Sequence, residues 1–218
     1  MPELLQIYRI LLKTYGQRHW WPADSPFEVV IGAFLTQNTN WRNVEKAIAN
    51  LRRADALSCA ALLRLSAAEV QELIRPAGFF RQKAERLQGF CHHLQTHYQD
   101  SLEAMLQQDS HHIRSELLSL KGIGPETADS ILLYAGQHLS FVVDAYTRRL
   151  FSRIGILQGA EKYAEIRDLF MARLPAEVEL YNEYHALIVQ HCKEFCRTKP
   201  LCPACPLADL CCYPKALT

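Results

Sequence analysis

The sequence of 218 residues lacks several features that would assign it to particular classes of protein. No stretch approaches the roughly 18–20 apolar residues of a membrane span, so no contact with a membrane is expected. The N-terminus, MPELLQIYRI, lacks the basic segment, apolar core and small-residue cleavage site of a signal peptide. The formal net charge is only +1, which neither indicates nor excludes nucleic-acid binding. We therefore expect a soluble cytoplasmic protein with a reducing environment around its thiols.

Alternating patterns typical of β-strands are also scarce, and the best candidate, Ser140–Val143, is short. Apolar residues instead recur at helical spacing, for example in the segments 4–12 and 180–188. The segments Ser25–Glu28 and Ser66–Glu69 each place serine at an N-cap and glutamate three residues later, which predicts a capping box. Low-complexity tracts and repeats are absent from the sequence. The sequence predicts an all-α protein.

Cysteine, by contrast, is concentrated near the C-terminus in a C-x5-C-x2-C-x5-C run formed by Cys196, Cys202, Cys205 and Cys211. Three prolines within this stretch oppose helix formation and favour turns that let sulfur atoms converge. The single x2 pair is unlike a zinc ribbon, which usually has two C-x2-C pairs. A [4Fe-4S] cluster is the first interpretation, one zinc ion the second, and disulfides the third.

The remaining cysteines have simpler interpretations. Cys59 and Cys91 lie in apolar helical patterns, which predicts small buried side chains. Cys192 and Cys212 flank the four-cysteine run and are alternatives for its first and last members.

A second informative segment, residues 117–130, predicts a helix, a Gly-Ile-Gly turn and a second helix that begins at Pro125. Glycines permit positive φ and leave backbone N–H groups uncovered at a helix N-terminus, where phosphate binds. An ordinary helical hairpin with a glycine C-cap is the alternative. The residues concerned are Lys121, Gly122, Ile123 and Gly124. One helix downstream, Asp144 can be both the N-cap of a helix and a carboxylate facing a cleft.

The order L-x-G-I-G-x-x-T-A, V-D-x-x-x-x-R and four cysteines resembles the endonuclease III branch of the helix-hairpin-helix DNA glycosylases. The resemblance covers nearly the whole chain and includes the blocks 35–39 and 78–84. It implies a two-lobed all-α fold closed by a C-terminal [4Fe-4S] loop over residues 196–211. Family members commonly have x6 where this chain has x5 after Cys196, so Cys192 is the fallback for the first ligand.

One position departs from the bifunctional members of this family, in which a lysine attacks the sugar and forms a Schiff base. Here that position holds Glu126, and a carboxylate cannot form an imine. Asp144 matches the aspartate used throughout the superfamily, where it stabilises the oxocarbenium-like sugar and orients or deprotonates water. The resemblance therefore implies a monofunctional glycosylase without efficient lyase activity, which leaves an abasic site.

The aromatic residues point to a class of base. The combination of W-W-P, L-T-Q-N-T and G-I-G-x-E-[ST]-A-D resembles the endonuclease III-type 3-methyladenine glycosylases. N3- and N7-alkylated purines carry a positive charge, and each contact with an indole ring contributes roughly 0.5–2 kcal/mol. Known members of that subgroup need not carry the iron–sulfur loop, and the tryptophans could instead be core residues. The expected base pocket comprises Trp20, Trp21, Pro22, Trp41 and Tyr146.

Further expectations follow from the same resemblance. Residues 25–135 would form a six-helix domain with the hairpin at about 112–134, and residues 1–24 plus 136–218 would form the second domain. Gln37 and Phe79 match the positions that fill the gap left by a flipped base, although Phe79 could equally be core. Hairpin carbonyls would hold a monovalent cation, and basic residues of the cysteine loop would meet phosphates. We expect a monomer that binds double-stranded DNA with damaged bases, nucleoid-associated if the source is bacterial.

Two other functions remain open on the sequence. The chain could be a monofunctional glycosylase for mismatched or deaminated bases. It could also be a catalytically idle iron–sulfur protein that binds DNA or senses redox state, although retention of Asp144 argues against this. The pairs His92-His93 and His111-His112 lack metal-ligand spacing and are expected at the surface.

Overall fold

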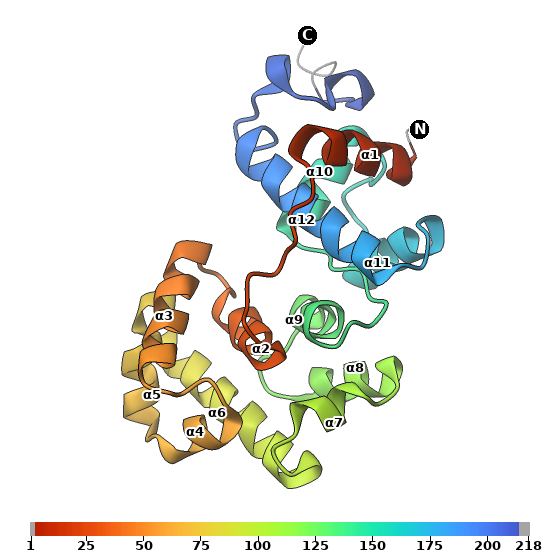
Figure 1. Cartoon of the computed structure of the whole chain (residues 1–218). Helices are drawn as coiled ribbons and strands as arrows, with labels where there is room; N and C mark the ends of the chain where they lie inside the picture. Colours follow the sequence, from red (N-terminus) through yellow and green to blue (C-terminus); the bar gives the residue numbers. More distant parts are fainter. Residues whose placement is uncertain (1–2, 214–218) are drawn as a thin grey trace. The chain divides into compact units, whose positions relative to one another are not determined.

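The computed structural model describes residues 3–213 of the chain, and these residues form two compact units (Figure 1). The central unit comprises residues 23–138. The terminal unit comprises residues up to Pro22 together with those from Leu139 onward. Residues 3–213 contain helices and no β-strand, which confirms the predicted all-α class. Among these residues, no helix has both the length and the apolar character that crossing a membrane requires.

The central unit is built around one helix that is buried on all sides. Helix α2 (Pro26–Leu35) packs against α3, α6, α9 and the π-helical turn η2, and every residue from Glu28 to Leu35 is buried. A helix that is apolar around its whole circumference is stable only when neighbours surround it. The surrounding elements are α3 (Trp41–Arg53), α4 (Cys59–Arg64), α5 (Ala67–Ile74), η1 (Arg75–Ala77), α6 (Phe80–Tyr98), α7 (Leu102–Leu106), α8 (Ser110–Ser119), α9 (Pro125–Ser130) and η2 (Ile131–Ala135).

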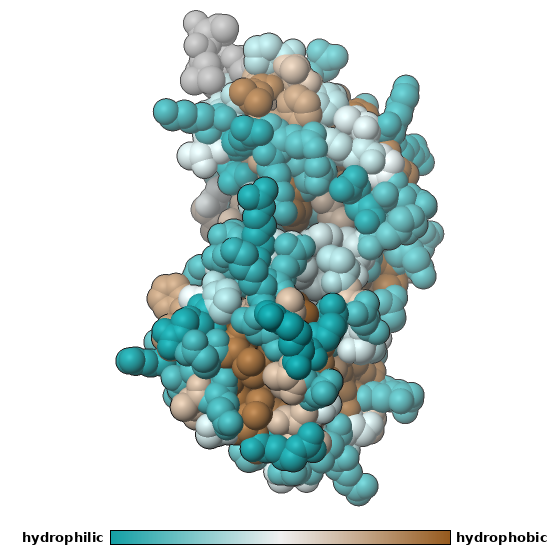
Figure 2. Space-filling view, turned by 60° about the vertical axis from the view of Figure 1, so that its left-hand side comes forward, coloured by the Kyte–Doolittle hydropathy of each residue, from teal (hydrophilic) through white to brown (hydrophobic). Residues whose placement is uncertain are grey.

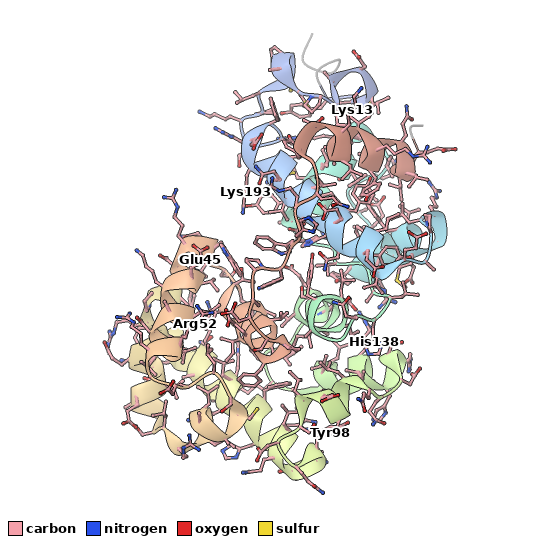
Figure 3. All side chains as sticks on the ribbon, in the orientation of Figure 1. Lys13, Glu45, Arg52, Tyr98, His138 and Lys193 are labelled. Carbon is pink, nitrogen blue, oxygen red and sulfur yellow. The ribbon has the colours of Figure 1, made fainter. Side chains whose placement is uncertain are left out.

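The two expected capping boxes differ in outcome. At α5, Ser66 Oγ accepts a hydrogen bond from the Glu69 backbone N–H, and the Glu69 carboxylate accepts one from the Ser66 backbone N–H, as predicted. At α2, Ser25 caps the Glu28 backbone N–H at 3.2 Å. The Glu28 carboxylate does not accept the second capping-box hydrogen bond from the Ser25 backbone N–H, because it is buried and pairs with Arg52 of α3 at 2.9 Å. Arg52 lies on the side of α3 that faces α2 (Figure 3).

The terminal unit is arranged around α12 (Val178–Glu194), which packs against α1 (Leu4–Tyr15) and α10 (Ala145–Ile154) (Figure 1). Helix α11 (Tyr163–Arg173) contributes Phe170, which stacks on Phe141 with ring centroids 4.3 Å apart. Phe141 belongs to the segment Ser140–Val143, which is buried irregular backbone leading into α10 and not a strand. After α12, the chain continues through two short turns, η3 (Cys202–Ala204) and η4 (Ala208–Leu210).

Large apolar side chains are rare on the described surface. The exposed ones are Phe79, Leu139 and Leu201, with exposed fractions of 64%, 40% and 49%. Figure 2 shows one face of the molecule, on which hydrophilic residues predominate and apolar areas are limited. Phe79 is the most exposed of the three, so the interpretation of Phe79 as a core residue is wrong.

Candidate functional site

The helix-hairpin-helix of the central unit has the turn that its glycines predict. Helix α8 ends at Ser119, Gly122 has a φ of +84°, and α9 begins at Pro125 with Gly124 as its N-cap. Ile123 is 6% exposed and therefore packs into the protein beneath the turn. Lys121 is exposed and pairs with Glu85 of α6 at 2.7 Å. The buried Ile123 side chain therefore holds the turn against the protein, and the Lys121 ammonium beside it lies at the surface.

A buried ion pair joins the two helices of the hairpin. Arg114 of α8 donates two hydrogen bonds to the Asp129 carboxylate of α9, at 2.8 and 3.1 Å. Asp129 is completely buried, and a bidentate arginine–carboxylate pair fixes orientation as well as distance. The hairpin is therefore held by a directional contact as well as by apolar packing.

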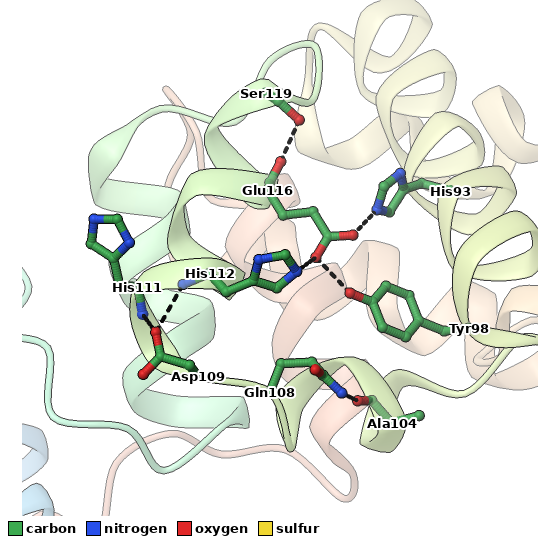
Figure 4. A network of polar contacts seen from close by, with 9 residues as sticks. All are labelled: His93, Tyr98, Ala104, Gln108, Asp109, His111, His112, Glu116 and Ser119. Atoms are coloured by element: carbon green, nitrogen blue, oxygen red, sulfur yellow. Dashed lines mark hydrogen bonds and ion pairs between the residues drawn. The ribbon is translucent and has the colours of Figure 1, made fainter.

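A second polar network holds α8 against α6 (Figure 4). The Glu116 carboxylate accepts a hydrogen bond from Tyr98 Oη at 2.7 Å and contacts His93 Nε2, while His112 lies 3.9 Å away. Burial and the neighbouring Glu116 charge raise the pKa of Tyr98 to about 12. His93 is therefore a partly buried partner of Glu116, which corrects the expectation that His92-His93 lies wholly at the surface. His111 and His112 are exposed, as expected.

Gln37, one of the two expected wedge residues, is tied to the hairpin turn. Its amide nitrogen donates to the Gly122 carbonyl at 3.1 Å and to Thr127 Oγ1 at 3.0 Å. Its amide oxygen accepts from Arg86 Nη1 of α6 at 2.9 Å. Arg86 fills the space beside Gly122, where an added Cβ would lie 2.2 Å from Arg86 Nε. Insertion of Gln37 into DNA stays a prediction, and it requires these three bonds to break.

Phe79, the second expected wedge residue, has strained backbone and an exposed ring. Its φ is +46°, a region that bulky residues rarely adopt, and it follows Gly78 with a φ of +66°. Strain of this kind persists where the surroundings enforce it and often marks functional sites. Here Lys83 is the enforcing residue: its buried ammonium donates to the carbonyls of Ala77 and Leu35, each at 2.9 Å.

Lys83 thus connects the Phe79 loop to the end of α2, directly before the corner that contains Gln37. Burial lowers the pKa of Lys83 to about 8, with the charge of Arg86 as a second cause. Lys83 and Arg86 lie within one turn of α6, so one helix braces the Phe79 loop, the Gln37 corner and the hairpin turn. Sequence reasoning noted Lys83 only as part of a family-like block, because burial of a lysine leaves no trace in local sequence.

In the terminal unit, Asp144 is the N-cap of α10, as predicted. Its Oδ1 accepts hydrogen bonds from the backbone N–H of Thr147 at 2.7 Å and from Thr147 Oγ1 at 2.9 Å. Its Oδ2 lies 3.5 Å from Nε2 of His185 on α12. Although burial opposes ionisation, His185 and these Thr147 bonds outweigh it and lower the pKa of Asp144. Asp144 is therefore ionised at neutral pH, with one oxygen occupied and the other facing His185.

Sequence reasoning did not identify His185. It occupies an apolar helical pattern on α12 and is 7% exposed, so periodicity alone predicts a core residue. Its partner lies 41 positions earlier in the chain, and no local signal links the two. Glu126, at the position of the family's lysine, is exposed in the first turn of α9.

The expected base-pocket residues are divided between the two units. Trp20 and Trp21 belong to the terminal unit, are half-buried, and have ring centroids 5.6 Å apart. The preceding backbone is anchored by Glu183 of α12, whose carboxylate accepts from the N–H groups of Arg18 and His19. The other members are Pro22, which is exposed, Tyr146, which is half-buried on α10, and Trp41, which is half-buried at the start of α3 in the central unit. A shared pocket stays a prediction.

The four cysteines of the C-terminal run line one hollow, whose empty space of about 360 Å³ includes open solvent. Other lining residues include Leu150, Ile154, Phe195 and Leu207. All described cysteines are free thiols, so the disulfide interpretation finds no support in this structure. Cys192 does not line the hollow, and its Sγ lies 3.6 Å from the Tyr146 carbonyl. Cys212 is exposed and also lies outside the lining.

Side-chain nitrogen atoms lie beside two of these sulfur atoms. Arg153 Nη1 lies 3.3 Å from Cys196 Sγ, and Nε2 of the buried His191 lies 3.6 Å from Cys205 Sγ. Tyr15 Oη lies 3.0 Å from the other ring nitrogen of His191. The neighbouring Cys192 thiol and Arg153 lower the pKa of Cys196 to about 6 against the effect of burial. Within residues 3–213, no three cysteine, histidine or acidic side chains converge as tightly as a single metal ion requires.

The chain is similar to several known proteins. Residues 31–176 match the model of the HhH-GPD superfamily base excision DNA repair proteins. A protein of Methanocaldococcus jannaschii, whose name provisionally assigns it to the DNA repair glycosylases, is 51% identical over 209 residues, which cover 95% of each chain. The crystal structure of the 3-methyladenine DNA glycosylase of H. pylori bound to 1,N6-ethenoadenine has a TM-score of 0.78 and 29% identity, covering 88% of this chain and 98% of that one.

A non-covalent complex of endonuclease III with DNA has a TM-score of 0.85 and 24% identity, covering 100% of this chain and 99% of that one, and this likeness concerns the fold. The family match spans two thirds of the sequence and includes the second half of α2, the hairpin and Asp144. The chain is therefore an endonuclease III-like member of the HhH-GPD superfamily, a DNA glycosylase of base excision repair.

Proposed function

We propose that the chain is a monofunctional DNA glycosylase that releases alkylated purines of the 3-methyladenine type by hydrolysis of the N-glycosidic bond. The monofunctional assignment rests on two residues of the chain: Glu126 occupies the position where a lyase needs an amine, and Asp144 is ionised. An amine nucleophile would form a Schiff base with C1′, whereas a carboxylate cannot. Hydrolysis then depends on a carboxylate that stabilises positive charge on the sugar.

Asp144 has the properties that this role requires. Thr147 occupies Oδ1 and fixes the carboxylate plane, so Oδ2 is the oxygen left for the sugar and the attacking water. The low pKa keeps the group anionic when the oxocarbenium-like sugar develops its charge. An alkylated purine is cationic and departs as a neutral base, so a general acid is unnecessary.

Two observations support alkylpurines as the substrate class. The indole rings of Trp20 and Trp21 lie next to each other in the terminal unit, which also contains Asp144, and electron-rich rings attract a cationic base. The H. pylori relative, similar over most of both chains, is named for 3-methyladenine. Tyr146 of the same unit is a further member of the proposed pocket.

Binding to duplex DNA would rest on the hairpin and the Phe79 loop. Lys121 and the turn Gly122-Ile123-Gly124 would contact phosphates, and Phe79 would enter the stack where the damaged base leaves. Lys193, Arg197 and Lys199 are exposed around the end of α12 and the cysteine loop, where they could meet the same backbone (Lys193 is labelled in Figure 3). Phosphate contacts of this kind position a protein without reading sequence.

We further propose that Cys196, Cys202, Cys205 and Cys211 hold a [4Fe-4S] cluster. The residues present fit that group, because four free thiols line one hollow, an N–H donor of Arg153 faces Cys196 and a ring nitrogen of His191 faces Cys205. A cubane takes one thiolate on each of its four irons, which holds the sulfurs farther apart than a single tetrahedral ion does. When bound, the cluster would cross-link the loop that follows α12.

A panel of duplexes with single lesions tests this function. We expect release of 3-methyladenine, with 7-methylguanine as a second substrate, and strand cleavage only after alkali. Borohydride should trap no covalent complex with wild-type protein, while Asp144→Asn should lose excision by at least about 100-fold and still bind DNA. Faster release of uracil, mismatched thymine or thymine glycol would refute the alkylpurine assignment. Excision of no lesion would leave a DNA-binding protein without catalytic function.

A further inference from the structure

The pair formed by the partly buried Asp144 and the buried His185 extends the proposed hydrolysis by one proton-transfer step. The reaction converts a cationic base, a sugar and water into a neutral base, an abasic sugar and one proton. The bond between C1′ and the purine nitrogen breaks with its electron pair on the base, and the water oxygen bonds to C1′. The water must therefore lose a proton, and Asp144 is its first acceptor.

Asp144 by itself is a poor final acceptor. Its Oδ1 accepts two hydrogen bonds from Thr147, which favour the anion over the protonated acid. A protonated Asp144 would also lose the negative charge that stabilises the sugar. The oxygen that is not held by Thr147 lies 3.5 Å from His185 Nε2, so a second base stands directly behind the carboxylate.

We propose that neutral His185 is a positioning residue that receives, through Asp144 Oδ2, the proton released by the attacking water. This inference rests on the proposed hydrolytic function. In the competent state, Nε2 carries the lone pair and the ring proton is on Nδ1. A histidine has the pKa suited to such a transfer near neutral pH. The distance of 3.5 Å is longer than a normal hydrogen bond, so the two groups are adjacent without being locked together.

The positive charges of the transition state favour a neutral His185 imidazole over an imidazolium. The transition state already contains a cationic base and a sugar that is becoming cationic. An imidazolium 3.5 Å from Asp144 would offset the negative charge of this carboxylate and repel both positive groups. The rate of excision should therefore fall when His185 becomes protonated.

Few other groups near the pair can change charge between pH 5.5 and 8. Burial raises the pKa of Tyr184, and Tyr8 of α1, whose pKa is also raised, packs against it. Contact with Cys196 and burial raise the pKa of Cys192, which also senses the Asp144 charge. Their raised pKa values keep these three groups neutral in this range. The hydroxyl of Tyr163 of α11 accepts from the Val143 N–H at 3.4 Å. The fixed charges closest in sequence to the pair on these two helices are Arg148 and Arg149 on α10 and Glu183 on α12.

The test compares wild type, His185→Gln and His185→Phe in single-turnover excision of whichever lesion wild type removes, from pH 5.5 to 8. Wild-type rates should fall about tenfold on acidification, because protonation of one imidazole removes the proton acceptor. His185→Gln keeps polar atoms but cannot accept a proton. At pH 8 it should be about 10- to 100-fold slower, and its rate should change less than twofold with pH. His185→Phe should match it.

Controls separate this inference from its alternatives. His92→Gln, which changes an exposed histidine of α6, should retain the wild-type rate and pH profile. Thermal melting and binding to undamaged duplex identify a variant that has merely lost its fold, and His185→Gln is then judged alone. If His185→Gln keeps the acid limb, or the wild-type rate, the proton-transfer role is wrong. If wild type removes no lesion, it is the proposed function that fails, because no rate exists to compare.

Discussion

The side-chain amide of Gln37 donates a hydrogen bond of 3.1 Å to the backbone carbonyl of Gly122, which joins the corner after α2 to the hairpin turn. The same amide accepts from Arg86, and Arg86 lies in the space that a side chain at position 122 would occupy. The turn that is proposed to bind phosphate is therefore fixed by a three-residue contact within the central unit.

Replacement of Gly122 by alanine should disturb this contact. An L-residue at a φ of +84° costs about 1–2 kcal/mol, and the new Cβ would displace Arg86 from Gln37. We expect a lower melting temperature and weaker binding to undamaged duplex. Gly89→Ala is the matched control, because Gly89 is helical with nothing within 4 Å of an added Cβ, and it should raise stability by about 0.5–1 kcal/mol. Unchanged duplex affinity in Gly122→Ala would contradict a role of this turn in DNA binding.

Lys83 makes a pH-dependent contribution to stability. Its pKa is about 8 in the folded protein and 10.5 without the protein environment, so the folded state binds its proton less tightly. Between pH 8 and 10.5, the unfolded chain keeps a proton that the folded chain releases, and this contribution to stability rises with pH. Below pH 8 it is constant. The neutral amine retains two N–H groups for the carbonyls of Leu35 and Ala77.

Denaturant unfolding of wild type and Lys83→Met across this range measures the effect. The free energy of unfolding of wild type, relative to Lys83→Met, should increase from pH 7.5 to 10 by about 2–3 kcal/mol. Lys121→Met, which changes an exposed lysine of the same unit, should show no comparable slope. Parallel pH curves for wild type and Lys83→Met would show that Lys83 keeps an ordinary pKa.

A substitution of Phe79 can test its proposed role in excision without lowering the stability of the protein. Phe79→Gly removes the cost of a positive φ, about 1–2 kcal/mol, from a side chain that is 64% exposed and contributes little to the core. This variant should be as stable as wild type or more so. If Phe79 fills the stack, it should excise the lesion at least about tenfold more slowly from duplex DNA, with little change on single-stranded DNA of the same sequence.

Two comparisons make that result specific. Leu201→Gly removes another exposed apolar side chain and should leave both rates unchanged. Equal losses of Phe79→Gly on duplex and single-stranded substrate would assign Phe79 to general DNA affinity, which would contradict the wedge role.

Sequence patterns predicted an element of this fold correctly where the contact that stabilises the element joins residues close together in the chain. The Ser66–Glu69 capping box and the Gly-Ile-Gly turn involve residues a few positions apart, and both occur as predicted. Glu28 shows the limit of that reasoning. Its spacing from Ser25 fits a capping box, but Arg52, 24 positions away, offers a charged partner at 2.9 Å and takes its carboxylate.

The same distinction applies to the candidate site. Asp144 was predicted because an N-cap is defined by the helix that follows it, whereas His185 and Lys83 lie in helical patterns that only tertiary packing makes functional. The role of Cys192 depended on which side of α12 its sulfur faces, and local spacing does not determine this. In the structure it lies beside the Tyr146 carbonyl, outside the hollow lined by the other four thiols.

That placement leads to a prediction about the cluster. Wild-type protein should be yellow-brown and contain about four irons per chain, as a cubane requires. Cys196→Ser, Cys202→Ser, Cys205→Ser and Cys211→Ser should each lose iron and visible absorbance, because each removes one thiolate. Cys212→Ser is the surface control, and Cys192→Ser tests the alternative first ligand. Both should keep the wild-type iron content. Loss of iron in Cys192→Ser, with retention in Cys196→Ser, would move the first ligand to position 192. Colourless protein with one zinc would replace the cluster by a single ion.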